Sequence, residues 1–99
     1  MSPQKRKKLS KIRSELDKID NSLIKIIKKR TFLVKKVLEL KDRKNQIVDQ
    51  KRIDSILKRL NIEAKKRGIP ESMIENLWKI MIKSFIKYEQ EIYDQVHKE

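Results

Sequence analysis

Three charged residues stand on the apolar faces of predicted helices, where side chains of their types can recognise a small anion. Apolar residues recur in steps of three and four between residues 9 and 40, and Arg30 fills the one place that this stripe skips. Lys41 follows Arg30 by eleven residues, about three helical turns, and therefore returns to nearly the same face. Glu89 lies four residues after Phe85 on the apolar face of another predicted helix.

An inward-facing guanidinium cannot lose its charge, so Arg30 needs an anion beside it. Two sources remain open: an internal ion pair between Arg30 and Glu89, or a bound ligand. Arg30 and Lys41 together exceed the charge of Glu89, and a pocket with surplus positive charge and apolar walls suits a small dianion. Arg13, next to Ile12 of the stripe, can join this cluster from the same chain or from a partner chain.

The stripe predicts one long helix, from about residue 4 to about residue 41, with Pro3 suited to its start. At about 1.5 Å per residue this helix is roughly 57 Å long, about twice the width of a compact domain of this size. The rest of the chain is too short to cover it, so we expect a second copy to do so in a homodimer. The stripe consists of Leu9, Ile12, Leu16, Ile19, Leu23, Ile26, Leu33, Val37 and Leu40.

Two more helices are predicted after a polar connection at residues 42–48. Asp49 is suited to cap the second helix, which ends at Gly68, since glycine is the residue expected just beyond a helix C-terminus. Pro70 begins the third helix, and no segment has the pattern of a strand. We therefore predict an all-α fold of a long, a medium and a long helix, forming one domain over residues 1–99.

The scarcity of several residue types excludes many kinds of chemistry. The chain has no cysteine, His97 is its only histidine and Gly68 its only glycine. Disulfides, thiolate chemistry, histidine-based triads or metal sites, and glycine-rich phosphate loops are therefore not expected. We therefore expect no cofactor and no metal. We also expect no membrane partner, because no continuous apolar segment follows the basic N-terminus. Cytoplasmic localisation is the resulting expectation.

The net charge of +13 raises the question of a polyanionic partner such as nucleic acid. Lysine outnumbers arginine by 20 to 7, which a bias toward AT-rich codons would also produce, so both explanations of the charge remain open. A non-catalytic basic dimer that binds nucleic-acid phosphates is the competing class of function. No recognition-helix pattern is evident and aromatic residues make up only 5% of the chain, so we do not expect a nucleic-acid partner.

Several segments, in a fixed order on the three helices, carry a resemblance to a known family. They are residues 12–20 (IRSELDKID), Lys29-Arg30, Lys41, residues 48–52 (VDQKR), and residues 77–82 (LWKIMI) followed by Glu89. In this order the chain resembles the all-helical chorismate mutase family, the AroQ type, from residue 9 to about residue 90. The resemblance implies an intertwined homodimer in which the long first helices pair and two equivalent sites form.

The resemblance also implies roles for residues of this chain. Arg13 would reach the site of the partner subunit and Arg30 would stay in its own, both binding substrate carboxylates through the planar fork of arginine. Lys41 would donate to the breaking ether oxygen. Asp49 and Arg52 would line the site around the ring hydroxyl and carboxylate.

Glu89 matches a position where the family carries Gln or Glu facing the same ether oxygen. The implied reaction, chorismate to prephenate, is a unimolecular [3,3] rearrangement that needs no nucleophile, only a near-attack geometry and stabilisation of the ether oxygen. To donate a hydrogen bond, Glu89 must be protonated. Burial raises the pKa of such a carboxyl group, while a nearby cation such as Lys41 lowers it.

Two positions depart from the usual mutase pattern. Chorismate mutases of this type usually have Glu directly after the arginine equivalent to Arg52, and here that residue is Ile53. They commonly have Ser four residues before the Gln or Glu position, and here that residue is Phe85. A register that used Ser84 and Tyr88 would restore the serine, but it would break the otherwise gap-free spacing, so we retain Phe85.

Both departures resemble the related isochorismate-pyruvate lyases, which share the fold and convert isochorismate to salicylate and pyruvate. Against that alternative, the lyases carry Gln where this chain has Glu89. The expected substrate is therefore chorismate, with isochorismate as the alternative.

Overall fold

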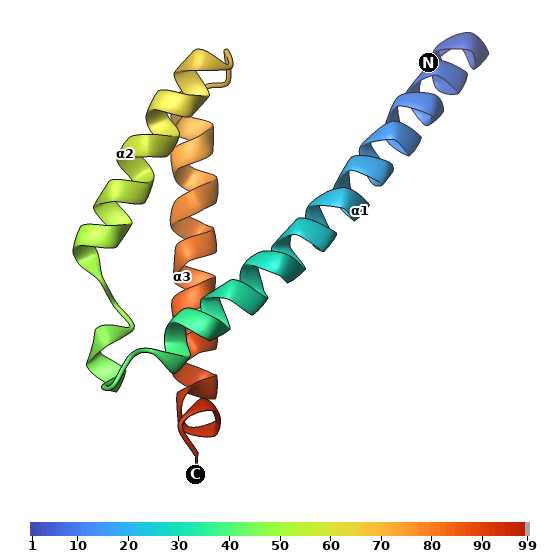
Figure 1. Cartoon of the computed structure of the whole chain (residues 1–99). Coiled ribbons are helices and arrows are strands. Elements are labelled where there is room, and N and C mark those ends of the chain that lie inside the picture. The colour runs from blue at the N-terminus through green and yellow to red at the C-terminus, as the bar shows by residue number, and fades with distance from the viewer. Residues whose placement is uncertain (99) are drawn as a thin grey trace. The chain divides into compact units, whose positions relative to one another are not determined.

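Helices make up most of this chain in a computed structural model that describes residues 1–98 (Figure 1). Helix α1 comprises Pro3–Glu39, α2 comprises Gln50–Lys66 and α3 comprises Glu71–Val96, with a short 3₁₀ turn at Lys44–Gln46 between α1 and α2. No strand occurs among the described residues. The predicted order of a long, a medium and a long helix is confirmed.

Helix α1 ends earlier than the prediction that extended it to Lys41. The amide N–H groups of Leu40 and Lys41 donate to the carbonyl oxygens of Val37 and Leu38 at 3.0 and 3.1 Å. These bonds span three residues instead of four, so the final turn tightens and the α-helix stops at Glu39. Lys41 therefore lies just beyond the end of α1, and its place on nearly the same face as Arg30 stays a prediction.

Both ends of α2 have the chemistry that the sequence predicts. Asp49 is the N-cap, and its Oδ1 accepts a hydrogen bond from the backbone N–H of Arg52 at 3.1 Å. At the other end Gly68 has a φ of 68°, a left-handed conformation that favours glycine. The backbone N–H of Ile69 then donates to the carbonyl of Ala64 at 2.9 Å, which closes the helix end. Pro70 directly precedes α3 as its N-cap.

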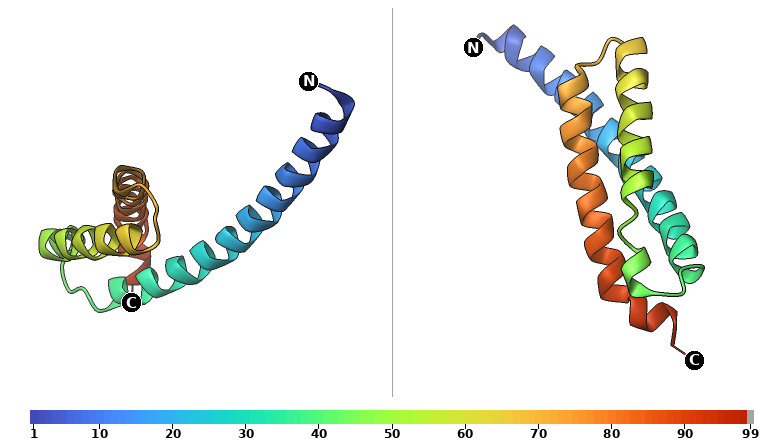
Figure 2. Two further views of the ribbon diagram at one scale, coloured as in Figure 1. Left: turned by 90° about the horizontal axis from the view of Figure 1, so that it is seen from above. Right: turned by 90° about the vertical axis from the view of Figure 1, so that its left-hand side faces the viewer.

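The chain divides into two compact units, Met1–Leu33 and the part that begins at Val34. In the second unit α2 and α3 run side by side in opposite directions, joined by the turn at Gly68 (Figures 1 and 2). The buried apolar side chains all belong to this second unit: Leu38, Ile47, Ile56, Ala64 and Ile82. Leu38 and Ile47 are close in sequence to Lys41 and Asp49, and Ile82 lies about two turns before Glu89 on α3.

The first unit consists of α1 up to Leu33, and its apolar stripe is not buried within the single chain. Ile12, Leu16, Ile19, Leu23, Ile26 and Leu33 have exposed fractions between 49 and 59%. This exposure agrees with the expectation that the rest of the chain is too short to cover the stripe. The apolar face stays exposed because the first unit contains only this helix, and no second segment of the unit packs on it.

Candidate functional site

Lys41 is held by the connection that follows α1. Its side chain is half-buried, and its Nζ donates to the carbonyl oxygen of Ile47 at 3.3 Å. Ile47 is itself buried, so the carbonyl that receives this bond has a fixed position. The ammonium group has three N–H donors and this bond uses one of them. Lys41 can therefore be positioned by the protein and still donate to a bound molecule.

Lys41 and Asp49 line the same hollow in the second unit. The hollow has a volume of about 480 Å³, and its walls also include Leu40, Gln46, Val48, Gln50 and Lys51. Because α2 begins directly after Asp49, the capping bond to the Arg52 N–H fixes that carboxylate at the edge of the hollow. Two of the residues predicted for the site, one cation and one anion, are thus brought together.

Helix α3 contributes Phe85 and Glu89, one helical turn apart. Glu89 is 7% exposed and is the one buried polar or charged residue in the described part of the chain, whereas Phe85 is half-buried. Ser84 lies on the exposed side, and its hydroxyl donates to the carbonyl of Ile80 at 2.9 Å. This arrangement favours the register that places Phe85, and not Ser84, on the inner side of α3.

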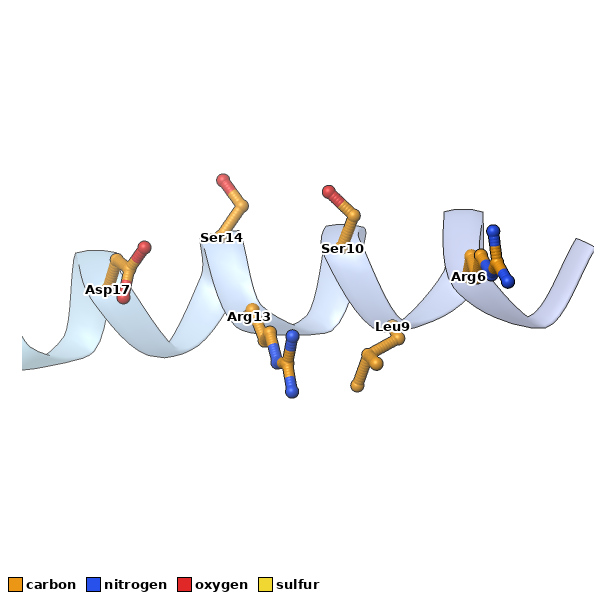
Figure 3. A pocket seen from close by; sticks show the side chains of 6 residues that line it. All are labelled: Arg6, Leu9, Ser10, Arg13, Ser14 and Asp17. Carbon is orange, nitrogen blue, oxygen red and sulfur yellow. The ribbon is translucent and has the colours of Figure 1, made fainter. Parts of the chain in front are cut away.

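Arg13 and Arg30 belong to the first unit. Arg30 is half-buried and Arg13 is exposed. Figure 3 shows that Arg13 and Leu9 point to one side of α1, away from Ser10 and Ser14. The hollow beside Arg13, about 380 Å³, is lined by residues of this one helix: Arg6, Leu9, Ser10, Arg13, Ser14 and Asp17. Helix α1 therefore supplies a single wall here, and a bound molecule would need another wall from elsewhere.

Ile53, the first departure from the mutase pattern, is half-buried in the first turn of α2, directly after the exposed Arg52. An aliphatic side chain at this point offers no hydrogen bond to a hydroxyl group. The contacts of Arg52 with a substrate stay a prediction, as do those of Arg13 and Arg30.

His97 makes a contact that the sequence did not predict. Its Nε2 lies 2.9 Å from the carbonyl oxygen of Leu38, and its ring lies 4.3 Å from that of Tyr93, centre to centre. Sequence reasoning treated His97 only as too isolated for a triad or a metal site. The one local signal was the aromatic residue four positions earlier, a spacing that places two side chains on the same helix face.

Residues 1–98 contain no cluster of three His, Cys, Asp or Glu residues placed to hold a metal ion. Within the same part of the chain, no helix combines the length and the apolar composition that crossing a bilayer requires.

Three helices in this order, with a buried acid on the last of them, define the described part of the chain as an all-helical protein. A model of the family described as chorismate mutase type II matches residues 12–90. This match covers most of the chain, so the protein belongs to the chorismate mutase type II family and is an isomerase whose family substrate is chorismate. A search of curated proteins found no match to this chain.

Proposed function

We propose that the protein converts chorismate to prephenate in two equivalent sites, each built from both chains of an intertwined homodimer. The observation that carries the proposal is the burial of Glu89 on α3, within the matched residues 12–90 and at the position that the resemblance equates with the family's Gln or Glu. A carboxyl group on this otherwise apolar helix face can donate a hydrogen bond when it is protonated. In this proposal it donates that bond to the ether oxygen of chorismate.

Substrate binding in this proposal depends on the arginines of α1. Arg30 binds a carboxylate of chorismate in the site of its own chain, and Arg13 binds the other from the partner chain. Helix α1 has 13 basic and four acidic residues, so it holds +9 of the chain's net charge of +13. This concentration supports the attraction of a substrate with two carboxylates, since surfaces of one charge sign raise the local concentration of the opposite ion.

Catalysis in this proposal depends on fixed donors around the breaking C–O bond. The ammonium of Lys41 and the protonated carboxyl of Glu89 donate to the ether oxygen as negative charge develops there. Removal of one such donor costs about 10²- to 10³-fold in kcat in enzymes that use them. Asp49 and Arg52 contact the ring hydroxyl and carboxylate, and Phe85 forms the apolar wall beside Glu89.

The alternative reaction is removal of pyruvate from isochorismate, and the observations that favour it are Ile53 and Phe85. The deciding experiment is to incubate the purified protein with chorismate and with isochorismate separately and to identify the products. Prephenate from chorismate supports the proposal, whereas salicylate and pyruvate from isochorismate would replace it with the lyase. Absence of any product would overturn both reactions.

Glu89→Gln tests whether a protonated acid takes part. A carboxylate can only accept hydrogen bonds, so kcat of the unmodified enzyme is expected to rise as the pH falls and Glu89 becomes protonated. Gln donates at every pH, so the variant is expected to have a flatter profile above neutrality. The measurement is kcat between about pH 5 and pH 8 for both proteins. An unmodified enzyme with constant kcat over this range would contradict the protonated role of Glu89.

Leu23→Lys tests the homodimer. Leu23 is 49% exposed in the single chain and belongs to the stripe that the second copy is proposed to cover. A lysine there places a charge in the interface, so sedimentation velocity is expected to show loss of the dimer and assays loss of turnover. Ile24→Lys is the matched control, because Ile24 is adjacent, 65% exposed and outside the stripe. Equal behaviour of the two variants would count against the proposed interface.

A further inference from the structure

The C-terminal end of α3 is tied to the C-terminal end of α1 through His97. The Nε2 of His97 lies 2.9 Å from the carbonyl oxygen of Leu38. A carbonyl oxygen can only accept, so Nε2 carries the proton, whether the ring is neutral or charged. The bond joins residues 59 positions apart in the sequence. It therefore joins the ends of α3 and α1, which are far apart in the sequence.

The Leu38 carbonyl oxygen also accepts a hydrogen bond from the backbone of Lys41. The N–H of Lys41 donates to Leu38 O at 3.1 Å, as part of the tight turn that ends α1. A carbonyl oxygen has two lone pairs and can accept both bonds. The Leu38 side chain is fully buried, which anchors this peptide unit from the other side. One carbonyl thus connects His97 with the main chain of Lys41.

The imidazole ring is itself held in place. Its face packs at 4.3 Å from the ring of Tyr93, and the backbone N–H of His97 donates to the carbonyl of Tyr93 at 3.1 Å. These two contacts continue the last turn of α3 up to His97. The ring is therefore supported on one side by α3 and bonded on the other to the end of α1.

We propose that His97 is a positioning residue for Lys41. His97 fixes the Leu38 carbonyl oxygen, which also accepts a hydrogen bond from the backbone N–H of Lys41. The side chain of Lys41 is fixed separately, because its Nζ donates to the carbonyl oxygen of Ile47. This inference rests on the proposed role of Lys41 at the ether oxygen. Rates of oriented reactions are sensitive to small displacements, and about 1 Å can cost roughly 10²-fold. Because the backbone bond of Lys41 remains without His97, we expect a smaller loss, about tenfold in kcat.

His97→Leu and His97→Gln test the proposal as a pair. Leu keeps much of the volume and removes the donor, whereas the Gln side-chain amide supplies an N–H at a similar reach. The expected result is kcat about tenfold lower with nearly unchanged KM in His97→Leu, and kcat within about twofold of the original in His97→Gln. Gln95→Leu is the matched control, since Gln95 is exposed in the same turn and its side chain makes no bond within residues 1–98.

A merely structural role predicts a different pattern, in which the loss of activity follows the thermal unfolding midpoint and Gln gives no recovery. Wild-type kcat in His97→Leu, no recovery in His97→Gln, or an equal loss in Gln95→Leu would overturn the inference. The variant Lys41→Gln distinguishes a failure of the inference about His97 from a failure of the proposed function. If Lys41→Gln is nearly inactive while His97→Leu is fully active, only the inference fails. If Lys41→Gln retains full activity, the proposed role of Lys41 fails first.

Discussion

Arg30→Ala is expected to lower kcat/KM for chorismate about 10³-fold, because in the proposed site it removes a charged, forked hydrogen-bond donor from a substrate carboxylate. A loss of this size corresponds to roughly 4 kcal/mol of transition-state binding. Arg30→Lys keeps the charge and loses the fork, so an intermediate loss is expected. Steady-state kinetics with chorismate, together with the thermal unfolding midpoint, measure both effects. Lys29→Ala is the matched control, since Lys29 is adjacent, exposed and also carries one positive charge.

The unfolding midpoint distinguishes the two uses of Arg30 that the sequence left open. If Arg30 serves mainly as an internal partner of Glu89, removing it leaves a buried acid without that partner and lowers stability by about 3–5 kcal/mol. If Arg30 serves mainly the substrate, activity falls far more than stability does. Full activity with chorismate in Arg30→Ala would remove Arg30 from the site and with it the central residue of the proposal.

Mixed dimers of Arg13→Ala and Arg30→Ala are expected to recover activity that neither variant has alone. In the proposed dimer each site takes Arg30 from one chain and Arg13 from the other. A mixed dimer therefore contains one site with both arginines and one site with neither. Random pairing of equal amounts gives half mixed dimers, so about one quarter of the original activity should return after joint unfolding and refolding.

The control for this experiment mixes Arg30→Ala with Lys41→Gln. Both residues are proposed to serve the site of their own chain, so every site in the mixed dimer lacks one of them and no recovery is expected. Recovery in this control would contradict the assignment of Arg30 and Lys41 to the same chain's site. Absence of recovery in the Arg13 and Arg30 mixture would show that Arg13 does not act across the interface.

Local sequence signals predicted the helices and their ends well where the determinants are local. Asp49 caps α2 through a backbone N–H only three residues away, and Gly68 supplies the one left-handed residue that the turn to α3 needs. Periodicity likewise placed Glu89 on the buried side of α3. Each of these features depends on residues within one or two helical turns, so the pattern contained enough information.

Features that depend on distant residues were not predictable in this way. The tight turn that ends α1 at Glu39 is stabilised at Leu38 O by Lys41 and by His97, and the latter lies 59 positions away. No periodicity encodes such a bond. The site in which Arg13 acts is a further case, since in the proposed dimer the rest of that site comes from the other chain. The family resemblance supplied that expectation, and the residues alone did not.

The exposed stripe of α1 has a consequence for how the fraction of active enzyme depends on the protein concentration. A single helix with half-exposed leucines and isoleucines is marginal by itself in water. On the proposed dimer, ordering of the first unit and association of two chains become one event, and apparent stability then depends on protein concentration. Specific activity would fall on dilution, with a steepness set by mass action. Abundance itself would act as a threshold for catalysis.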